Sequence, residues 1–533
     1  MPSIHLSHIA FRWPDDTPLF TDVSLSVAPG RTGLVAANGA GKSTLLRLAA
    51  GELTPTAGSV SVEGSIGYLP QTLPLLDDRT VAELLGVADA IRALDALAAG
   101  DASDAVFSAI GDDWDVVERT RAQLDRLGLH HLGLDRSLRT LSGGEVVTLG
   151  IARELLRRTE VLLLDEPTNN LDTEARHRLY TVLDEFTGAL LLVSHDRVLL
   201  DRMDRIAELR GDEVTVFGGP FSAYTEAVED AQRAARGAVR QAEQQLRREK
   251  REQQQARERA ERRAGAARRS LPDAGLPKIV AGAMKRRAQE SAGRADDVNA
   301  RRVETARTRL ADAERVLRDD DPLILDLPAT AVPSGRMLLQ CRNVCVDHAG
   351  RQVLAGVDLT VRGPERIALT GPNGSGKTTL LRTLLGEITP SGGSVQRLAG
   401  RPAHVSQRLD ALDENRSVAE NLAAVAPGMP VTRRRHLLAQ LLFGGDIADR
   451  PARVLSGGER LRATLACVLF AEPAPQLLLL DEPTNNLDLA SARRLEEALS
   501  AYRGAVIVVS HDQAFLDAIG IDRHLRLSGG VLR

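Results

Sequence analysis

Short apolar runs that end in polar, chemically reactive residues recur along the chain and predict buried strands. Val161–Leu164 and Leu477–Leu480 contain only apolar residues, and each is followed at once by Asp-Glu. Leu190–Val193 and Val506–Val509 are similar runs, each followed by Ser-His-Asp. A short, wholly apolar run is typical of a strand that is covered on both faces, as in a parallel sheet. No run approaches the ~18 apolar residues of a membrane helix. The buried parallel strands that these short runs predict indicate an α/β fold.

The middle of the chain has a different pattern, which is polar and favours helix. Residues 231–310 hold 22 Lys and Arg against 10 Asp and Glu, an excess of 12 positive charges, among many Ala and Gln. Two prolines and a glycine interrupt this pattern at 271–277, and it resumes from about Met284 to Leu317. We therefore predict a first helix of about 45 residues, ~65–70 Å long, then a loop and a returning helix. Three pairs of opposite charge have the i,i+4 spacing that supports an exposed helix: Glu243–Arg247, Arg248–Glu252 and Glu258–Arg262.

One series of motifs occurs twice, which indicates a repeat of domain size. The copies lie 335 residues apart at the first motif and 314 to 316 apart at the later ones, whereas Gln71 and Gln407 still differ by 336. The first copy therefore carries about 20 extra residues between Gln71 and Leu141, which include the helix-favouring Ala88–Ala99. The repeated segments are Asn38–Arg47 with Asn373–Arg382, Leu141–Glu145 with Leu455–Glu459, Leu162–Asp172 with the identical Leu478–Asp488, and Ser194–Asp196 with Ser510–Asp512.

These patterns predict two repeated α/β domains joined by a long basic helical hairpin. The first domain is expected at 1–221, with a short arm inserted within 72–140. The linker is expected at 222–325 with its tip at about 271–287, and the second domain at 335–533.

Composition adds few constraints. Apolar residues make up 43% of the chain, charged residues 26%, and the net charge is −4, as in ordinary soluble proteins. The N-terminus lacks the basic and apolar regions of a secretory signal. Cys341, Cys345 and Cys467 form neither a disulfide framework nor a paired zinc spacing. We expect them to be small packing residues in a reduced cytoplasm.

The first repeated motif is a phosphate-binding loop. Gly371-x4-Gly376-Lys377-Thr378 matches the pattern in full, whereas Ala36 replaces the leading glycine in the first copy. The glycines let N–H groups converge on phosphates at a helix start, and the lysine reaches the β- and γ-phosphates. Because the leading glycine serves backbone conformation, we expect the first copy still to bind ATP. The predicted ATP-binding residues of the loops are Asn38, Gly39, Ala40, Gly41, Lys42, Ser43, Thr44, Gly371, Pro372, Asn373, Gly374, Ser375, Gly376, Lys377, Thr378 and Thr379.

Polar residues that follow the apolar runs are candidates for catalysis and metal binding. A carboxylate at the carboxyl end of a parallel strand lies where α/β sheets bind ligands, and it can hold Mg²⁺ directly or through water. The glutamate after it can polarise the water that attacks the γ-phosphate. The predicted catalytic residues are Glu166 and Glu482, with His195 and His511 orienting that water. The predicted Mg²⁺ ligands are Ser43, Gln71, Asp165, Thr378, Gln407 and Asp481.

Two further elements are predicted to contact the nucleotide. The Leu-Ser-Gly-Gly-Glu segments begin helices whose N–H groups favour an anion. Their candidate residues are Ser142, Gly143, Gly144, Ser456, Gly457 and Gly458. Trp13 and His348 precede the phosphate loops and are candidates to stack on adenine; the alternative is that Trp13 packs at a sheet edge.

These motifs resemble the ABC ATPase superfamily. Two such domains on one chain, Asn-Asn-Leu-Asp after each Asp-Glu-Pro-Thr, and a basic helical linker are similar to the ABC-F family. The resemblance implies an intramolecular ATP sandwich in a monomer, with each Ser-Gly-Gly segment completing the other copy's site. It also implies ribosome binding near the tRNA E and P sites, with the hairpin reaching toward the P-site tRNA. Candidate RNA contacts at the tip are Lys278, Lys285, Arg286 and Arg287.

The short arm and the proline-interrupted tip resemble the antibiotic-resistance, ribosomal-protection branch of actinobacteria. Charge agrees with an RNA partner, because a projecting segment with an excess of 12 positive charges suits phosphates. The alternative for the linker is a solvated tether between two ATPase domains. The alternatives for the whole chain are a housekeeping ABC-F translation factor, the ATPase component of a transporter, and a DNA-associated ATPase.

Overall fold

The computed structural model describes residues 1–71, 78–169, 171–270, 298, 300–315, 327–348, 350–398, 402–405, 411–441, 443–485 and 487–533. The chain forms two compact units. One consists of Met1–Phe221 together with Pro322–Arg533, and the other is Ser222–Asp321. Within the larger unit, residues 1–221 are called the first half and residues 335–533 the second half.

Each half contains the same six-stranded sheet. In the first half the strand order is β5-β6-β7-β3-β8-β9, with β5 to β8 parallel and β9 antiparallel at the edge. In the second half the order is β14-β15-β16-β12-β17-β18, with the same directions. The strands of the first half are β3 (Gly30–Val35), β5 (Ile66–Leu69), β6 (Val161–Asp165), β7 (Ala189–Val193), β8 (Arg205–Arg210) and β9 (Glu213–Gly218). Those of the second half are β12 (Arg366–Thr370), β14 (Ala403–Val405), β15 (Leu477–Asp481), β16 (Ala505–Val509), β17 (Arg523–Ser528) and β18 (Val531–Leu532).

A three-stranded antiparallel sheet accompanies each large sheet. The order is β2-β1-β4 in the first half and β11-β10-β13 in the second. Their strands are β1 (Ser3–Arg12), β2 (Pro18–Val27), β4 (Ala57–Glu63), β10 (Arg336–His348), β11 (Arg351–Gly363) and β13 (Gly392–Arg397). Apolar side chains of the two sheets form one core in each half, and they include Ile4, Leu45 and Leu163 in the first.

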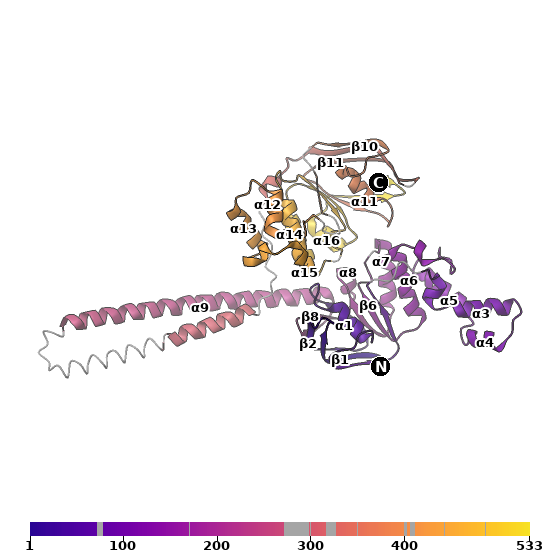
Figure 1. The fold of residues 1–533 in the computed structure, drawn as a ribbon, viewed down its shortest axis with the longest axis horizontal. Helices are drawn as coiled ribbons and strands as arrows, with labels where there is room; N and C mark the ends of the chain where they lie inside the picture. Colours follow the sequence, from indigo (N-terminus) through magenta and orange to yellow (C-terminus); the bar gives the residue numbers. More distant parts are fainter. Residues whose placement is uncertain are drawn as a thin grey trace. The chain divides into compact units, whose positions relative to one another are not determined.

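Helices complete each half, and Figure 1 labels most of them. Those of the first half are α1 (Lys42–Ala49), α2 (Val81–Leu85), α3 (Ala88–Ala98), α4 (Asp104–Ile110), α5 (Val116–Arg126), α6 (Gly143–Leu156), α7 (Thr173–Asp184) and α8 (Arg197–Leu200). Those of the second half are α11 (Lys377–Leu385), α12 (Val418–Val425), α13 (Val431–Gln440), α14 (Gly457–Leu469), α15 (Leu489–Ala501) and α16 (Gln513–Ile519). Short 3-10 turns lie at Leu138–Thr140, Pro328–Thr330, Gly445–Asp449 and Ala452–Val454.

The wholly apolar runs became the central strands for a simple physical reason. Every residue of β7 and β16 is buried, as are the four leucines of β15, because helices and the second sheet cover both faces. In register, Asp165 at the end of β6 lies opposite Val193 of β7, and Asp481 lies opposite Val509 of β16. The residues that follow these strands therefore meet at one edge of each sheet.

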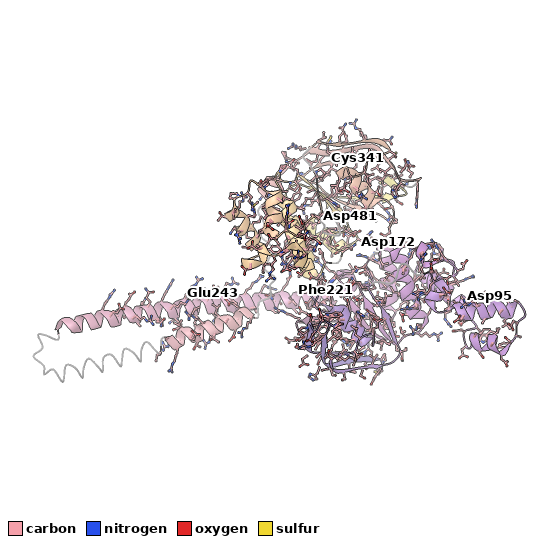
Figure 2. All side chains as sticks on the ribbon, viewed as in Figure 1. Asp95, Asp172, Phe221, Glu243, Cys341 and Asp481 are labelled. Carbon is pink, nitrogen blue, oxygen red and sulfur yellow. The ribbon has the colours of Figure 1, made fainter. Side chains whose placement is uncertain are left out.

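The smaller unit is helical. Helix α9 runs over Phe221–Ser270, 50 residues, which is longer than the length expected from sequence. Residues 300–315 are also helical, and Arg302 adds to the effect of Arg248 in lowering the pKa of Glu252, so this segment passes beside α9. The pairs Glu243–Arg247 and Arg248–Glu252 form at 3.6 and 2.8 Å (Glu243 is labelled in Figure 2).

The predicted fold class, α/β with two P-loop domains and a helical segment between them, is confirmed. The predicted tip at 271–287 lies outside the described residues. Cys341 and Cys467 are buried within the cores, where burial raises the pKa of each thiol to about 12. Among the described helices, none is long and apolar enough to cross a membrane.

Corresponding arginines hold the two large sheets in different ways. Arg366, at the start of β12, donates to the carbonyl oxygens of Ile519, Leu499 and Tyr502. Arg31, at the start of β3, instead pairs with Asp184 at 2.9 Å and Asp204 at 3.0 Å. Burial lowers the pKa of Arg366, and the charge of Asp522 acts in the opposite direction. The three carbonyl oxygens supply hydrogen-bond partners to a buried cation that would otherwise be costly.

Replacement of Arg366 by methionine should lower the free energy of unfolding by about 2–3 kcal/mol, since hydrogen bonds from a charged donor are lost and carbonyls lose a partner. Urea denaturation of the full chain would measure the change. Arg351→Met, at an exposed position on β11, is the control and should shift stability by less than about 0.5 kcal/mol. Equal stability of the two variants would contradict the prediction.

Candidate functional site

The phosphate loops connect a central strand to the helix that follows it. Helix α1 begins at Lys42 after Gly41, and α11 begins at Lys377 after Gly376; these glycines have φ of 96° and 98°. A Cβ atom at Gly41 would lie 2.4 Å from the ring of Phe20, and one at Gly376 would lie 2.9 Å from a methyl of Val353. Only glycine fits either position, so each helix presents its first N–H groups in an open cradle that suits a phosphate.

The lysine of each loop is held back against its own loop. Lys42 donates to the carbonyl oxygens of Ala36 and Ala37 at 2.8 and 3.3 Å. Lys377 donates to the carbonyl oxygens of Gly371 and Pro372 at 2.7 and 3.1 Å. Burial lowers the pKa of both lysines, and nearby carboxylates act in the opposite direction. Each ammonium group is therefore a partly desolvated cation beside the cradle, where an added phosphate would stabilise it.

The two loops differ at their first residue because the backbone differs there. Gly371 has φ of 149°, and a Cβ atom on it would lie 2.1 Å from the carbonyl oxygen of Leu527. Ala36 is absent from the residues with positive φ, and its methyl group packs against the core of the first half. The first loop thus accepts alanine because its chain enters the turn differently, and Lys42 still reaches the carbonyl of residue 36.

An aspartate and a hydroxyl lie together where Mg²⁺ is predicted in the first half. Burial raises the pKa of Asp165, and a hydrogen bond from Ser43 counteracts that effect. Oδ1 of Asp165 is buried and lacks a hydrogen-bond partner among the described residues. An uncompensated buried carboxylate oxygen beside a hydroxyl fits a small divalent cation that takes oxygen ligands. Gln71 lines the same cavity, whereas Gln407 lies outside the described residues.

In the second half, Asp481 ends β15 and Thr378 is the second residue of α11, at the places that Asp165 and Ser43 have in the first half. Figure 2 labels Asp481.

The glutamates that follow these aspartates have an unusual backbone. Glu166 and Glu482 have φ of 50° and 45°, which is strained for a residue with a side chain. Each is held there by its N–H group, which donates to the carbonyl oxygen of Val193 or Val509 at 2.8 and 2.9 Å. Burial raises the pKa of Glu166 to about 8 and that of Glu482 to about 7. A pKa close to neutral suits a group that takes a proton from water at neutral pH.

A histidine contacts each glutamate. Nε2 of His195 lies 3.2 Å from Oε1 of Glu166, and Nε2 of His511 lies 3.4 Å from Oε1 of Glu482. Burial lowers the pKa of His195 to about 3 and that of His511 to about 4, so both rings are neutral near pH 7. Oε1 of Glu166 and Nδ1 of His195 are buried without a hydrogen-bond partner among the described residues. Polar atoms left in this state favour a ligand or water at that position.

A cavity of about 450 Å³ joins these groups in the first half. Trp13, 36% exposed, lies at its wall and also packs edge to face on Phe11 with ring centroids 5.2 Å apart. The indole therefore packs at the sheet edge and still presents a surface to the cavity. His348 is exposed at the end of β10, opposite Arg351. The cavity is lined by Trp13, Leu19, Asn38, Gly39, Gly41, Lys42, Ser43, Thr44, Gln71, Asp165, Glu166, Asn169, Val193 and His195.

The Leu-Ser-Gly-Gly-Glu segments begin helices α6 and α14 with a capping box. The N–H groups of Ser142 and Ser456 donate to the carboxylates of Glu145 and Glu459 at 2.7 and 2.8 Å, and the serine hydroxyls accept in return. This local exchange fixes the helix starts. A Cβ atom at Gly457 would lie 3.9 Å from Nδ2 of Asn38, so α14 begins beside the phosphate loop of the first half.

The two halves also meet through residues that sequence reasoning missed. The N–H group of Asn38 donates to Oδ2 of Asp488 at 2.9 Å. On the other side, the charge of Asp172 acts on Lys377, and Oγ1 of Thr173 lies 3.2 Å from Nδ1 of His511. A signal for the aspartates was present, because each closes the longest identical segment of the repeat.

Comparisons with known proteins agree with this geometry. A family model described as ABC transporter matches residues 20–169 and 354–485. The tylosin resistance ATP-binding protein TlrC of Streptomyces fradiae is 36% identical over 570 residues, covering 100% of this chain and 98% of that protein. The energy-dependent translational throttle protein EttA of Mycobacterium tuberculosis is 31% identical, covering 94% of this chain and 87% of that protein.

Solved structures show the same fold. The archaeal ribosome recycling factor aABCE1, in complex with the ribosomal stalk protein aP1, aligns with a TM-score of 0.59 at 20% identity. The alignment covers 97% of this chain and 87% of that one. At this identity the likeness concerns the fold alone.

Gly371→Ala should weaken nucleotide binding by the second half about tenfold or more, because strained φ and a clash with a backbone carbonyl cost roughly 1–3 kcal/mol. Ala36→Gly should change binding by the first half less than about threefold, since residue 36 has no positive φ. Titration with a fluorescent ATP analogue would measure both. Gly371→Ala would be placed in a Lys42→Ala background, and Ala36→Gly in a Lys377→Ala background, so that one loop is read at a time. Equal effects of the two changes would contradict this account of the loops.

Proposed function

Because the chain belongs to the ABC-F family and is an ATPase with two ATP-binding domains, we propose that it closes its halves on two ATP molecules to act on the ribosome. It would bind near the tRNA E and P sites and modulate translation, conferring resistance to a ribosome-targeting antibiotic by ribosomal protection. The observation that carries this proposal is the 36% identity to a tylosin resistance protein over the whole chain. Work on ribosomes would place the protein in the cytoplasm.

We assign each ATP site to residues of both halves. The first site would combine Lys42, Asp165 and Glu166 with Ser456 and Gly458, and the contact of Asn38 with Asp488 supports this pairing. The second would combine Lys377, Asp481 and Glu482 with Ser142 and Gly144, which the approach of Asp172 to Lys377 supports.

We assign a role in hydrolysis to each kind of residue in these sites. Lys42 and Lys377 would leave their carbonyl partners to bind the β- and γ-phosphates, which recovers the energy lost by burying a cation. Glu166 and Glu482 would accept the proton of the attacking water, for which their raised pKa values suit them. The neutral histidines would hold the γ-phosphate and that water in line. Mg²⁺, when bound near Asp165 or Asp481, would offset the negative charge of the phosphates.

The basic helical unit is proposed to contact RNA. Residues 231–310 carry an excess of 12 positive charges, and the arginines of α9 that are described are mostly exposed. Neutralising phosphates with such side chains releases counterions and gives salt-sensitive affinity. The candidates Lys278, Lys285, Arg286 and Arg287 lie outside the described residues and remain part of this proposal.

A housekeeping role in translation is the second candidate. It is favoured by the 31% identity to a protein named as an energy-dependent translational throttle. Both roles involve ATP-driven ribosome binding at the same sites. They differ in whether expression of the protein changes susceptibility to an antibiotic.

The Glu166→Gln/Glu482→Gln double variant should lose ATPase activity by at least about a hundredfold, because both proton acceptors are removed. The same variant should co-sediment with ribosomes when ATP is present, and raising the salt concentration should release it. Arg178→Ala, at a surface ion pair with Glu174, is the control and should keep normal turnover. If ATP gives no more co-sedimentation with ribosomes than is seen without nucleotide, the ribosome proposal is wrong.

Expression in a susceptible host should raise the inhibitory concentration of at least one antibiotic that binds the peptidyl-transferase region or exit tunnel. The double glutamine variant should give no protection, since resistance requires ATP turnover in this proposal. Unchanged susceptibility across a panel of ribosome-targeting drugs would favour the housekeeping role instead.

A further inference from the structure

The helix that follows each Asn-Asn-Leu-Asp segment differs between the halves at positions facing the opposite half. Helix α7 carries Thr173 and Arg176 one and four residues after Asp172. The corresponding residues after Asp488 are Leu489 and Ala492. The eleven residues that end at Asp172 and Asp488 are identical in the two copies, so the difference begins directly after the aspartates that contact the opposite half.

Arg176 connects the first half to the histidine of the second. Its Nε donates to the carbonyl oxygen of Leu171 at 3.2 Å, and its Nη1 donates to the carbonyl oxygen of His511 at 3.3 Å. Oδ2 of Asp196 lies 3.6 Å from the same guanidinium. The side chain is only 12% exposed, so these interactions are weakly screened by water.

The histidine rings consequently have different partners. Nδ1 of His511 lies 3.2 Å from Oγ1 of Thr173, so the ring is held on the side away from Glu482. Nδ1 of His195 is buried and has no hydrogen-bond partner among the described residues. Leu489 cannot supply a hydroxyl, and Ala492 is buried in the core of the second half, where an arginine would not fit.

The two glutamates also differ in the charged groups around them. Glu482 faces the cations Arg176 and Lys377, together with Asp481 and His511. The cation that faces Glu166 is Lys42, together with Asp165, Asp196 and His195. The first half thus lends a positive charge to the second site, whereas no cation of the second half stands among the described groups that act on Glu166.

We propose that Arg176 is a positioning residue for one ATP site only. From the first half it fixes the backbone of His511, while Thr173 fixes the ring, so that the site of Lys377 and Glu482 is assembled by a clamp between the halves. At the site of Lys42 and Glu166, the described residues at the matching positions are Leu489 and Ala492, which cannot form this clamp. Hydrolysis at the second site is therefore coupled more tightly to closure of the halves. The inference rests on the proposed assignment of residues to the two ATP sites.

Steady-state ATP turnover of the full chain tests this inference in two backgrounds. Glu166→Gln leaves the second site active, and Glu482→Gln leaves the first. Arg176→Ala should lower kcat about tenfold in the Glu166→Gln background, with KM changed less than about twofold, since hydrogen bonds from a charged donor that hold a catalytic group are lost. In the Glu482→Gln background kcat should stay within about twofold. Arg176→Lys should restore part of the loss, because lysine keeps the positive charge but cannot donate to both carbonyl oxygens in the geometry of a guanidinium.

Matched variants separate positioning from general loosening of the interface. Arg197→Ala removes another contact between the halves, the 2.8 Å pair with Glu496, and should affect both backgrounds alike. Thr173→Val removes the hydroxyl beside the ring of His511, and it should give a smaller loss confined to the second site, even if Arg176→Ala folds poorly.

Two results would overturn the inference: equal losses in both backgrounds for Arg176→Ala, or a second-site loss of the same size for Arg197→Ala. The site assignment is checked first and separately. If neither glutamine substitution alone lowers turnover, the assignment itself is wrong, and the inference falls with it.

Discussion

The cost of burying two neighbouring carboxylates at the end of a central strand governs the arrangement of each half. Asp165 and Glu166 are buried, and Asp481 and Glu482 are partly buried, beside the same apolar strands that form the sheet. A buried charge of this kind needs an opposite charge, a donor or a metal nearby. The phosphate-loop lysine, the hydroxyl after it and the strained turn that aims the glutamate all serve that requirement. Buried polar atoms of Asp165, Glu166 and His195 have no protein partner among the described residues.

Much of this arrangement was predictable because it depends on local sequence. Apolar runs of four or five residues gave the central strands, and fixed motif spacings placed Lys42, Asp165, Glu166 and His195 around one cavity. That the first loop binds ATP despite Ala36 stays a prediction, and the reason the loop accepts alanine could not be read from the sequence. The backbone at residue 36 has no positive φ, which depends on how the chain leaves β3 rather than on the residue itself.

The contacts of Thr173 and Arg176 with the opposite half could not be predicted, because the candidate sites rest on a comparison of one copy with the other. That comparison highlights what is shared. Thr173 and Arg176 have no counterparts after Asp488, so they resembled ordinary exposed helix residues. The different partners of Arg31 and Arg366 could not be predicted either. Arg31 pairs with carboxylates, whereas Arg366 donates to backbone carbonyl oxygens. Every residue has a backbone carbonyl, so the sequence does not mark those partners.

Both copies of the motifs lie on one chain, so the two halves need not be identical. Two identical subunits related by a twofold axis present every residue twice, so an arginine that reaches across their interface must enter both sites. Here the copies are covalently joined and free to diverge, and among the described residues the position that matches Arg176 holds Ala492. The joining also gives each half a partner at a fixed effective concentration that does not depend on expression level. A single polypeptide can therefore give its two sites different duties, an option closed to a homodimer of the same fold.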